Sequence, residues 1–364
     1  MKKYFLLVFF LFVSGYSALP LGTRFKLIPN DEIFVIDTRD NGYYDVYEPE
    51  RNAYVKSFAL PGGLIDIAAG DLDRSGFDEI IGLRSTSPNR IYIRYRNSSG
   101  DWIGVDYDCG KRNLKYITAG DYLHDSISPG YEIIAASSDS IFWWSWNLSS
   151  GITLRKSMAK GPIYDITAGD IDGDREDEVV IITSGDKRGF DVISEKAGSF
   201  HFELPVKDET FGTWLALSGG NVQGDLRAEI VVLEDKYWPW EKCRLRFYQY
   251  NPADSTFQEI KVMGTDYGYL KDVACGNPDR DRYWEVFALD GEGSEYHKPV
   301  HIYSYQGKEG SFNLNGSKNP VRIAVGEYDG DNAQIELLGG PYLCSSELWP
   351  HFVLALPPYQ DGIV

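Results

Sequence analysis

The sequence predicts an all-β protein, a β-propeller built from four-stranded antiparallel blades. One observation is a segment that recurs six times, with an acidic loop beginning at positions 71, 121, 170, 221, 277 and 327. The spacing of these loops, 49 to 56 residues, falls in the range of propeller blades. The other observation is that no stretch of eleven or more residues has the 3.6-residue period of an amphipathic helix. We therefore expect little helix.

Each copy of the repeat has the same internal order. The six segments are AAGDLDRSGFDEIIGL (68–83), TAGDYLHDSISPGYEIIAA (118–136), TAGDIDGDREDEVVII (167–182), LSGGNVQGDLRAEIVVL (217–233), ACGNPDRDRYWEVFAL (274–289) and AVGEYDGDNAQIELLGG (324–340). A short apolar strand ends at a glycine, and the acidic loop then runs into a second strand. A third, aromatic strand follows, as in RIYIRYR (90–96), SIFWWSW (140–146), RLRFYQY (244–250) and VHIYSYQ (300–306). Short strands separated by polar turns are typical of antiparallel meanders.

Counting these strands predicts seven blades, with six or eight as the alternatives. The second strand occurs seven times if EIFVID (32–37) and QIELLG (334–339) are included. The third strand also occurs seven times, counting YYDVYE (43–48) and HFVLAL (351–356). First strands number six, so closing the ring requires a partner strand. We expect RFKLI (24–28) to pair with the last blade or to complete the first.

The loop that begins at Asp170 has the spacing of a cation site. Its carboxylates occupy positions 1, 3, 5 and 9, which are Asp170, Asp172, Asp174 and Glu178, and the carbonyl of Glu176 adds position 7. Alternate side chains of a tight loop point inward, so this spacing brings hard oxygen ligands to one point, as Ca²⁺ requires. An acidic surface turn without metal is the alternative, since Asp, Asn and Gly also favour turns. Four converging carboxylates would, however, repel one another without a cation.

The pattern G-D-x-D-G-D-x-x-x-E-[IV], repeated through nearly the whole chain, resembles the FG-GAP/VCBS repeats of integrin α-like β-propellers. The resemblance implies a structural Ca²⁺ in each intact loop, two to four ions in all, at one rim of the propeller. Three loops keep the pattern. Their implied ligands are Asp170, Asp172, Asp174, Glu176 and Glu178; Asp71, Asp73, Ser75, Phe77 and Glu79; and Asn277, Asp279, Asp281, Tyr283 and Glu285, with Phe77, Glu176 and Tyr283 acting through their carbonyls.

The other three loops depart from the pattern. The 121 loop has three extra residues, the 221 loop has two charged ligand positions, and the 327 loop has Ile335 at the closing position, so we expect weak metal binding or none there. Several loops also lack glycine at position 6 and carry Arg175, Leu226 or Arg282 instead. Because this position often needs a positive φ, we expect backbone strain at these residues.

The N-terminus has the layout of a secretory signal peptide. Residues 1–18 contain two lysines, an apolar run too short to span a bilayer, and then small residues. We therefore expect a mature domain of residues 19–364 that is secreted, periplasmic or on the cell surface, with no membrane insertion after cleavage. The formal net charge of −18 disfavours binding to nucleic acid and to anionic membranes.

The four cysteines, Cys109, Cys243, Cys275 and Cys344, are too few for a disulfide framework in a chain of this length, and their pairing stays open. Cys275 stands where sister segments carry alanine, which favours a small buried residue.

We predict a monomeric, non-catalytic binding or adhesion module for a protein or glycan ligand. The histidines are scattered, and Pro299 between His297 and His301 argues against a helical zinc pair. An extracellular carbohydrate-active enzyme, a lyase or hydrolase on a calcium-rich propeller, is the alternative, and a purely structural spacer is a second rival. Aromatic residues could form a recognition face, and we expect Trp238 and Trp240 in a loop.

Overall fold

The structure is a computed structural model. It describes residues 25–28, 32–37, 43–48, 53–59, 63–123, 130–183, 189–196, 198–203, 212–225, 227–235, 242–277, 282–291, 297–315, 320–326 and 334–337. Within these ranges every regular element is a β-strand, so the predicted all-β fold is confirmed there. None of the described segments is a helix long and apolar enough to cross a membrane. The predicted signal peptide lies outside the described residues.

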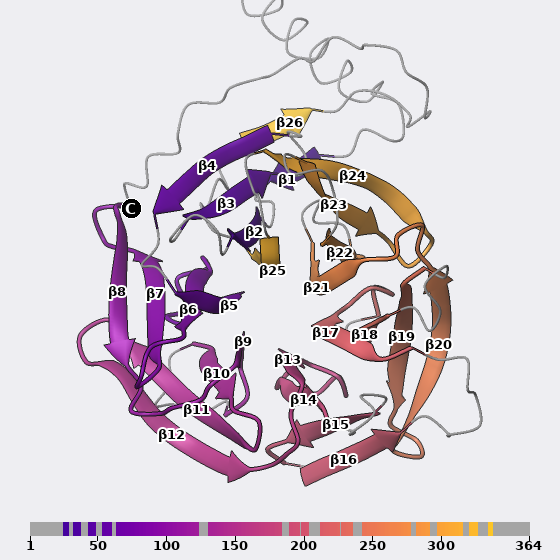
Figure 1. The fold of residues 1–364 in the computed structure, drawn as a ribbon, viewed down its shortest axis with the longest axis horizontal. Coiled ribbons are helices and arrows are strands. Elements are labelled where there is room, and N and C mark those ends of the chain that lie inside the picture. The colour runs from indigo at the N-terminus through magenta and orange to yellow at the C-terminus, as the bar shows by residue number, and fades with distance from the viewer. Residues whose placement is uncertain are drawn as a thin grey trace, which may run out of the picture. The chain divides into compact units, whose positions relative to one another are not determined.

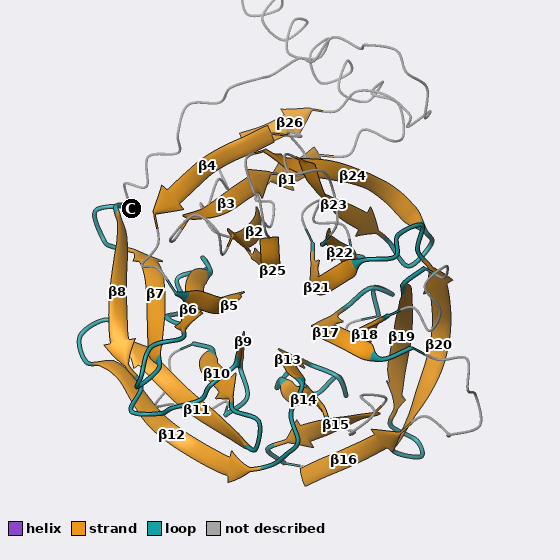
Figure 2. Ribbon diagram, in the orientation of Figure 1, coloured by secondary structure: helices purple, strands orange, loops and turns teal. Residues whose placement is uncertain are grey.

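The body formed by residues 30–330 contains six four-stranded antiparallel sheets (Figures 1 and 2). Five of them, blades 1 to 5, are each made of four consecutive strands. Their strands are β5 (Leu64–Gly70), β6 (Glu79–Arg84), β7 (Arg90–Arg96) and β8 (Trp102–Asp108); β9 (Tyr116–Gly120), β10 (Glu132–Ala136), β11 (Ser140–Asn147) and β12 (Gly151–Ala159); β13 (Asp165–Gly169), β14 (Glu178–Ile182), β15 (Gly189–Ser194) and β16 (Gly198–Glu203); β17 (Trp214–Gly220), β18 (Glu229–Glu234), β19 (Arg244–Asn251) and β20 (Thr256–Gly264); β21 (Leu270–Gly276), β22 (Glu285–Asp290), β23 (His297–Tyr303) and β24 (Lys308–Asn315).

The sixth sheet joins two distant parts of the chain and closes the ring. Its inner strand β25 (Pro320–Gly326) pairs with β2 (Glu32–Asp37), which continues into β3 (Tyr43–Glu48) and β4 (Ala53–Ala59). The N-terminal segment therefore supplies the three outer strands that follow the last inner strand. Closure of this kind removes the free edge that an open row of blades would leave.

The prediction of seven blades is wrong. QIELLG (334–339) has the sequence of a second strand, but its strand β26 (Gln334–Leu337) pairs with β1 (Phe25–Ile28) in a separate two-stranded sheet. These two strands belong to a second compact unit, residues 1–29 with 331–364. RFKLI (24–28) is therefore not a blade strand, and the closing role falls to residues 32–59. HFVLAL (351–356), the other counted strand, lies outside the described residues.

The six inner strands form a closed ring. Contacts run from β5 to β9, β13, β17, β21 and β25 and back to β5 (Figure 1). The glycine that ends an inner strand lets the next blade approach. A Cβ at Gly120 would lie 2.7 Å from the Ala168 Cβ and 2.9 Å from an Asp177 carboxylate oxygen. A Cβ at Gly70 would lie 2.7 Å from that of Ala119, so both glycines are set by packing between blades.

Backbone hydrogen bonds also join the acidic loops of neighbouring blades. The carbonyl of the first loop residue accepts the N–H of the residue that precedes the second strand of the next blade. The four described bonds are Tyr131 N–H to Asp71 at 3.0 Å, Asp177 N–H to Asp121 at 3.0 Å, Ala228 N–H to Asp170 at 2.7 Å and Trp284 N–H to Asn221 at 3.0 Å. Each loop is thereby held against the following blade.

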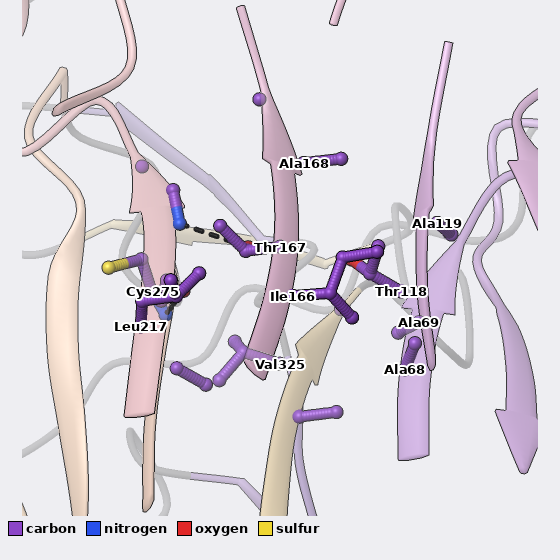
Figure 3. Close-up of a pocket in the computed structure, with 18 of the residues that line it drawn as sticks. Ala68, Ala69, Thr118, Ala119, Ile166, Thr167, Ala168, Leu217, Cys275 and Val325 are labelled. Atoms are coloured by element: carbon purple, nitrogen blue, oxygen red, sulfur yellow. Dashed lines mark hydrogen bonds between the residues drawn. The ribbon is translucent and has the colours of Figure 1, made fainter. Parts of the chain in front are cut away.

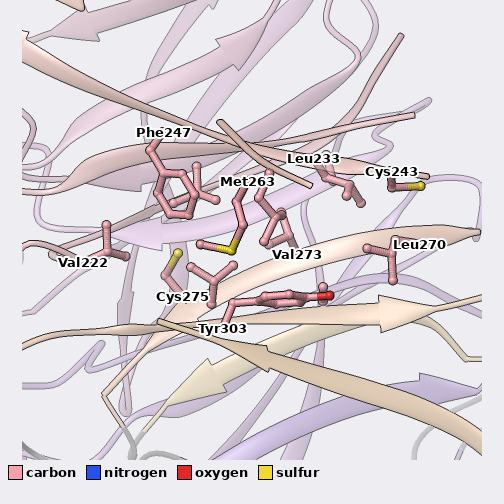
Figure 4. Packing of buried hydrophobic residues seen from close by; sticks show 14 residues of the cluster. Val222, Leu233, Cys243, Phe247, Met263, Leu270, Val273, Cys275 and Tyr303 are labelled. Carbon is pink, nitrogen blue, oxygen red and sulfur yellow. The ribbon is translucent and has the colours of Figure 1, made fainter. Parts of the chain in front are cut away.

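The hydrophobic core lies between neighbouring blades. One cluster combines blade 4 residues such as Phe247 and Met263 with blade 5 residues such as Val273 and Tyr303 (Figure 4). Apolar burial of this kind is the main term that stabilises packed sheets. The alternation of the aromatic strands is confirmed in β11: Trp144 and Trp146 pack in the core between blades 1 and 2.

Trp143 faces the opposite side of the same strand and packs in the core between blades 2 and 3. All three β11 tryptophans therefore contribute to packing between blades. Trp238 and Trp240 lie outside the described residues. Cys275 is buried as predicted, and Cys109, Cys243 and Cys275 are free thiols, while Cys344 lies beyond the described part of the chain.

Candidate functional site

The loop between β5 and β6 gathers three carboxylates. Oxygens of Asp71, Asp73 and Glu79 lie within 4.8 Å of one another. The loop backbone fixes the two aspartates: Ser75 N–H donates to Asp71 Oδ1 and to Asp73 Oδ1, both at 2.9 Å. Gly76 N–H donates to Asp71 Oδ2 at 2.9 Å. The spacing predicted from the sequence thus brings positions 1, 3 and 9 together.

The loop between β13 and β14 gathers a different set, Asp170, Asp172 and Asp174, again within 4.8 Å. Gly173 N–H and Arg175 N–H donate to the two oxygens of Asp170 at 2.8 and 3.0 Å. Positions 1, 3 and 5 meet here, whereas the predicted position 9 is used differently.

A lysine from the next hairpin sits beside this second loop. Lys196 Nζ lies 3.1 Å from Asp174 Oδ2 and 2.7 Å from Glu176 Oε1. Its side chain is 59% exposed, so this ammonium is a solvent-screened partner for the loop charge.

The closing glutamates are buried and hold their own loops. Glu79 Oε2 accepts the N–H of Leu72 at 2.8 Å, and Glu178 Oε2 accepts the N–H of Ile171 at 3.0 Å. Burial and the charge of Asp73 raise the pKa of Glu79 to about 9. Burial and the charge of Asp172 raise the pKa of Glu178 to about 8. Without a cation, both carboxyl groups hold their protons near neutral pH.

The remaining predicted ligands are placed only in part. Ser75 Oγ lies 3.5 Å from the Phe77 carbonyl oxygen, so both stay close to the first cluster. In the third loop Asn277 follows β21 directly and Glu285 begins β22, but residues 278–281, with the predicted Asp279 and Asp281, lie outside the description. Tyr283 contacts the guanidinium of Arg282 through its ring at 4.6 Å. The third cluster stays a prediction.

The 221 loop shows what replaces a cation. Glu229 Oε1 accepts Gln223 Nε2–H at 3.1 Å and Gln249 Nε2–H at 3.2 Å. Asp225 Oδ2 accepts Gln249 Nε2–H at 3.0 Å and lies 2.9 Å from the guanidinium of Arg227. Side-chain donors thus neutralise and bond the oxygens that face a cation in an intact loop. This fits the weak metal binding predicted for this loop from its low charge.

Positions 4 and 6 of the loops take left-handed conformations. In the 71 loop Arg74 has φ 60° and Gly76 has φ 86°, and in the 170 loop Gly173 has φ 86° and Arg175 has φ 73°. Each loop therefore has one glycine and one arginine where φ is positive. The strain predicted at Arg175 is confirmed, because a side chain is disfavoured in this region.

Replacing Arg175 with glycine is expected to stabilise the protein by about 1 kcal/mol, because it relieves left-handed strain. Chemical denaturation of Arg175→Gly and the parent chain measures the difference. Arg112→Gly is the matched control: Arg112 is exposed and is not among the described residues with positive φ. Glycine there should be neutral or destabilising, and equal effects at both positions would contradict the strain.

Inside the ring lies a cavity of about 530 Å³ that the sequence did not predict (Figure 3). Three buried aspartates line it, Asp66 on β5, Asp165 on β13 and Asp272 on β21, and each accepts an N–H from the next blade. Arg322 on β25 pairs with two of them, at 3.2 Å from Asp66 and 3.4 Å from Asp272. Burial raises the pKa of Asp66 to about 7 against the opposing charge of Arg322. Burial likewise raises the pKa values of Asp165 and Asp272.

A sequence signal for this layer exists. The three aspartates stand five residues before the loop starts at 71, 170 and 277, in alternate copies of the repeat. Arg322 stands five residues before the loop start at 327. The register of the repeats therefore places these four residues at one level of the inner ring.

Comparisons with known proteins support the fold alone. No protein-family model matches the chain, and no curated protein matches it. The chain is similar to a solved structure titled as the nidogen/laminin complex, with a TM-score of 0.53 and 11% identity over 82% of this chain and 99% of that chain. It is also similar to a mutant of AofleA from Arthrobotrys oligospora, with a TM-score of 0.51 and 9% identity over 83% and 92% of the two chains. Identities this low show a shared architecture, so the chain is a β-propeller of small antiparallel blades.

Proposed function

We propose that the protein is an exported, calcium-stabilised β-propeller of the FG-GAP/VCBS type that binds a protein or glycan ligand. The observation that carries the calcium proposal is the convergence of three carboxylates within 4.8 Å in each of two equivalent loops. The same repeat position supplies the first ligand in both, Asp71 and Asp170.

The donor set of these loops fits Ca²⁺. Carboxylate oxygens of Asp71, Asp73 and Glu79 would hold one ion, and those of Asp170, Asp172 and Asp174 another. Hard oxygen donors in an irregular loop are what Ca²⁺ prefers, whereas Mg²⁺ would require a smaller, octahedral arrangement. When bound, the ion supplies positive charge that offsets the repulsion among the carboxylates.

The proposed ions would act on more than their own hairpins. The Asp71 carbonyl accepts Tyr131 N–H, and the Asp170 carbonyl accepts Ala228 N–H, from the next blades. Fixing the first residue of a loop therefore also fixes its bond to the neighbouring blade. The ions would stiffen the ring at the rim where these loops lie.

The binding role is supported by the architecture and by the neighbours' titles. One similar protein was solved in a complex with laminin. Loops on a rigid scaffold commonly carry recognition. The test is binding of the purified chain to glycan and protein arrays with Ca²⁺ and with chelator. Binding that needs Ca²⁺ is expected. Turnover of a polysaccharide by the chain would instead favour the enzymatic alternative.

Calcium affinity at the 71 loop is expected to weaken as pH falls. The metal-free pKa of Glu79 is about 9 and Ca²⁺ takes the carboxylate, so binding displaces a proton. Between about pH 8 and pH 6 the loss is up to about 100-fold, tenfold per pH unit. Calcium titration of Asp172→Asn, in which the 170 loop is weakened, isolates this loop. An affinity independent of pH would contradict the prediction.

The same carboxyl sets the pH dependence of the metal-free chain. Its folded pKa is raised above the unfolded value of 4.5 to about 9. Its contribution to stability is therefore complete below about pH 4.5 and is lost as pH rises through about 9. Ca²⁺ should remove this loss at high pH.

A further inference from the structure

The cavity inside the ring has walls from all six inner strands. Its middle is apolar, with Ile166, Leu217 and Val325 among the residues that line it (Figure 3). Tyr131, which lines it at the loop end, is 37% exposed, so the cavity reaches solvent there. The shape is a tube with an apolar wall and one wet end.

The charge of this tube is entirely negative. Among the described residues that line it there are six aspartates and no lysine, arginine or histidine. Three aspartates lie at the inner level, Asp66, Asp165 and Asp272, and three lie toward the loops, Asp78, Asp170 and Asp177. Asp66 precedes Gly70 by four residues, which sets the inner level about 13 Å below the loop end.

The inner level has one carboxylate oxygen to spare. Arg322 pairs with Asp66 and Asp272, and both also accept backbone N–H groups. Asp165 uses Oδ2 to accept Leu217 N–H at 2.9 Å. In the described part of the chain its Oδ1 takes no hydrogen bond or ion pair, although the residue is only 7% exposed.

A buried acceptor without a donor is costly, and a carboxylate in this position attracts a cationic donor. A bare metal ion would find few free oxygens here, because the others at this level are taken by N–H groups and by a guanidinium. The apolar wall above Asp165 instead suits a stem of methylene groups. An ammonium has the donors for Oδ1.

We propose that the cavity binds a primary ammonium on a linear aliphatic stem, with the ammonium donating to Asp165 Oδ1 and the stem lying along the apolar wall. This inference deepens the proposed binding role and rests on it, but it needs no calcium. A lysine-like side chain of a partner and a free alkylamine present the same chemistry.

The experiment compares n-hexylamine with n-hexanol, which has the same stem and no charge. Isothermal titration of the full chain is expected to give an affinity for the amine about tenfold or more above that for the alcohol, the contribution of a charge-assisted hydrogen bond. Asp165→Asn keeps an acceptor for Leu217 N–H and removes the charge, so it should bind both probes equally. Asp108→Asn, on exposed Asp108 outside the cavity lining, should behave like the parent chain.

Equal affinity of the parent chain for both probes would overturn the proposal, and this comparison needs no variant to fold. A preference for the amine that persists in Asp165→Asn would overturn it as well, because the amine would then bind elsewhere. To separate partner from small molecule, a lysine-containing peptide competes with hexylamine, and competition supports a partner side chain. Absence of competition, with hexylamine bound, supports a free amine in the same cavity. Calcium titration reports on the loops alone, so failure of either proposal is seen separately.

Discussion

Ca²⁺ is expected to raise the free energy of unfolding of the chelator-treated protein by about 2.7 kcal/mol per occupied loop at about 100 times the dissociation constant. In the metal-free chain Asp71, Asp73 and Glu79 converge, so their charges repel or are neutralised by protons. An ion bound to the folded loop has no equivalent site in the unfolded chain. Denaturant unfolding at fixed pH, with chelator and with increasing Ca²⁺, measures the gain.

Two variants divide this gain between the loops. Asp73→Asn and Asp172→Asn each remove one carboxylate charge, while an amide oxygen can still accept the N–H that the carboxylate accepts now. Each should lose about half of the calcium-dependent stabilisation if both loops are occupied, and the double variant should lose nearly all of it. Asp108→Asn is the matched control, since Asp108 lies in neither cluster. Equal stability of the parent chain in chelator and in Ca²⁺ would refute the calcium proposal.

Strand order in the blades follows from local patterns, whereas the blade number does not. The apolar first strand, the EIIGL-type second strand and the alternating aromatic strand were each recognisable, and β5 to β8 keep that order. QIELLG (334–339) has the same pattern as a second strand, yet β26 pairs with β1. Which strand completes a blade is decided by long-range pairing. The pairing of β25 with β2 joins segments about 290 residues apart, and no local propensity encodes it.

The metal loops were predictable because their ligands lie within nine residues of one another. The closing glutamate was predicted only as a ligand. The structure gives it a second role, because Glu229 closes the 221 loop with amide donors where a cation would otherwise be needed. A glutamate needed to cap every loop recurs even where no metal site is complete. Its presence is therefore weaker support for metal than that of the aspartates at positions 1, 3 and 5.

The inner layer of aspartates was missed because its members act between blades. Asp66 accepts the N–H of Ile117, 51 residues away, and meets Arg322 from the opposite end of the chain. Only the closed ring brings these residues together. Once the repeat register is known, the recurrence of aspartate five residues before alternate loops becomes informative.

Replacing Arg322 with methionine is expected to destabilise the protein by about 3–5 kcal/mol at neutral pH, the usual cost of leaving a buried carboxylate without its partner. Arg322 is the cation that pairs with both Asp66 and Asp272, and all three belong to the inner ring. Methionine keeps much of the length of the side chain and removes the guanidinium. Denaturant unfolding measures the loss.

The loss should depend on pH with a definite sign. The pKa of Asp66 is already raised from 3.8 to about 7 with Arg322 present, and removing the cation raises it further. A protonated carboxyl costs little to bury, so Arg322→Met should approach the stability of the parent chain at about pH 5 and fall away from it as pH rises through about 7. A constant difference across this range would mean that the arginine acts through packing alone.

Adding Asp66→Asn and Asp272→Asn to Arg322→Met tests the same point without changing pH. The amides keep acceptors for the N–H groups of Ile117 and Ile323 and bring no charge. If the cost of the single variant is uncompensated charge, the triple variant should be more stable than Arg322→Met at about pH 8. A triple variant no more stable than the single one would show that the inner layer needs its ion pairs for geometry. In that case the charge on Asp165, which has no cation within ion-pair distance among the described residues, becomes the best probe of what the cavity attracts.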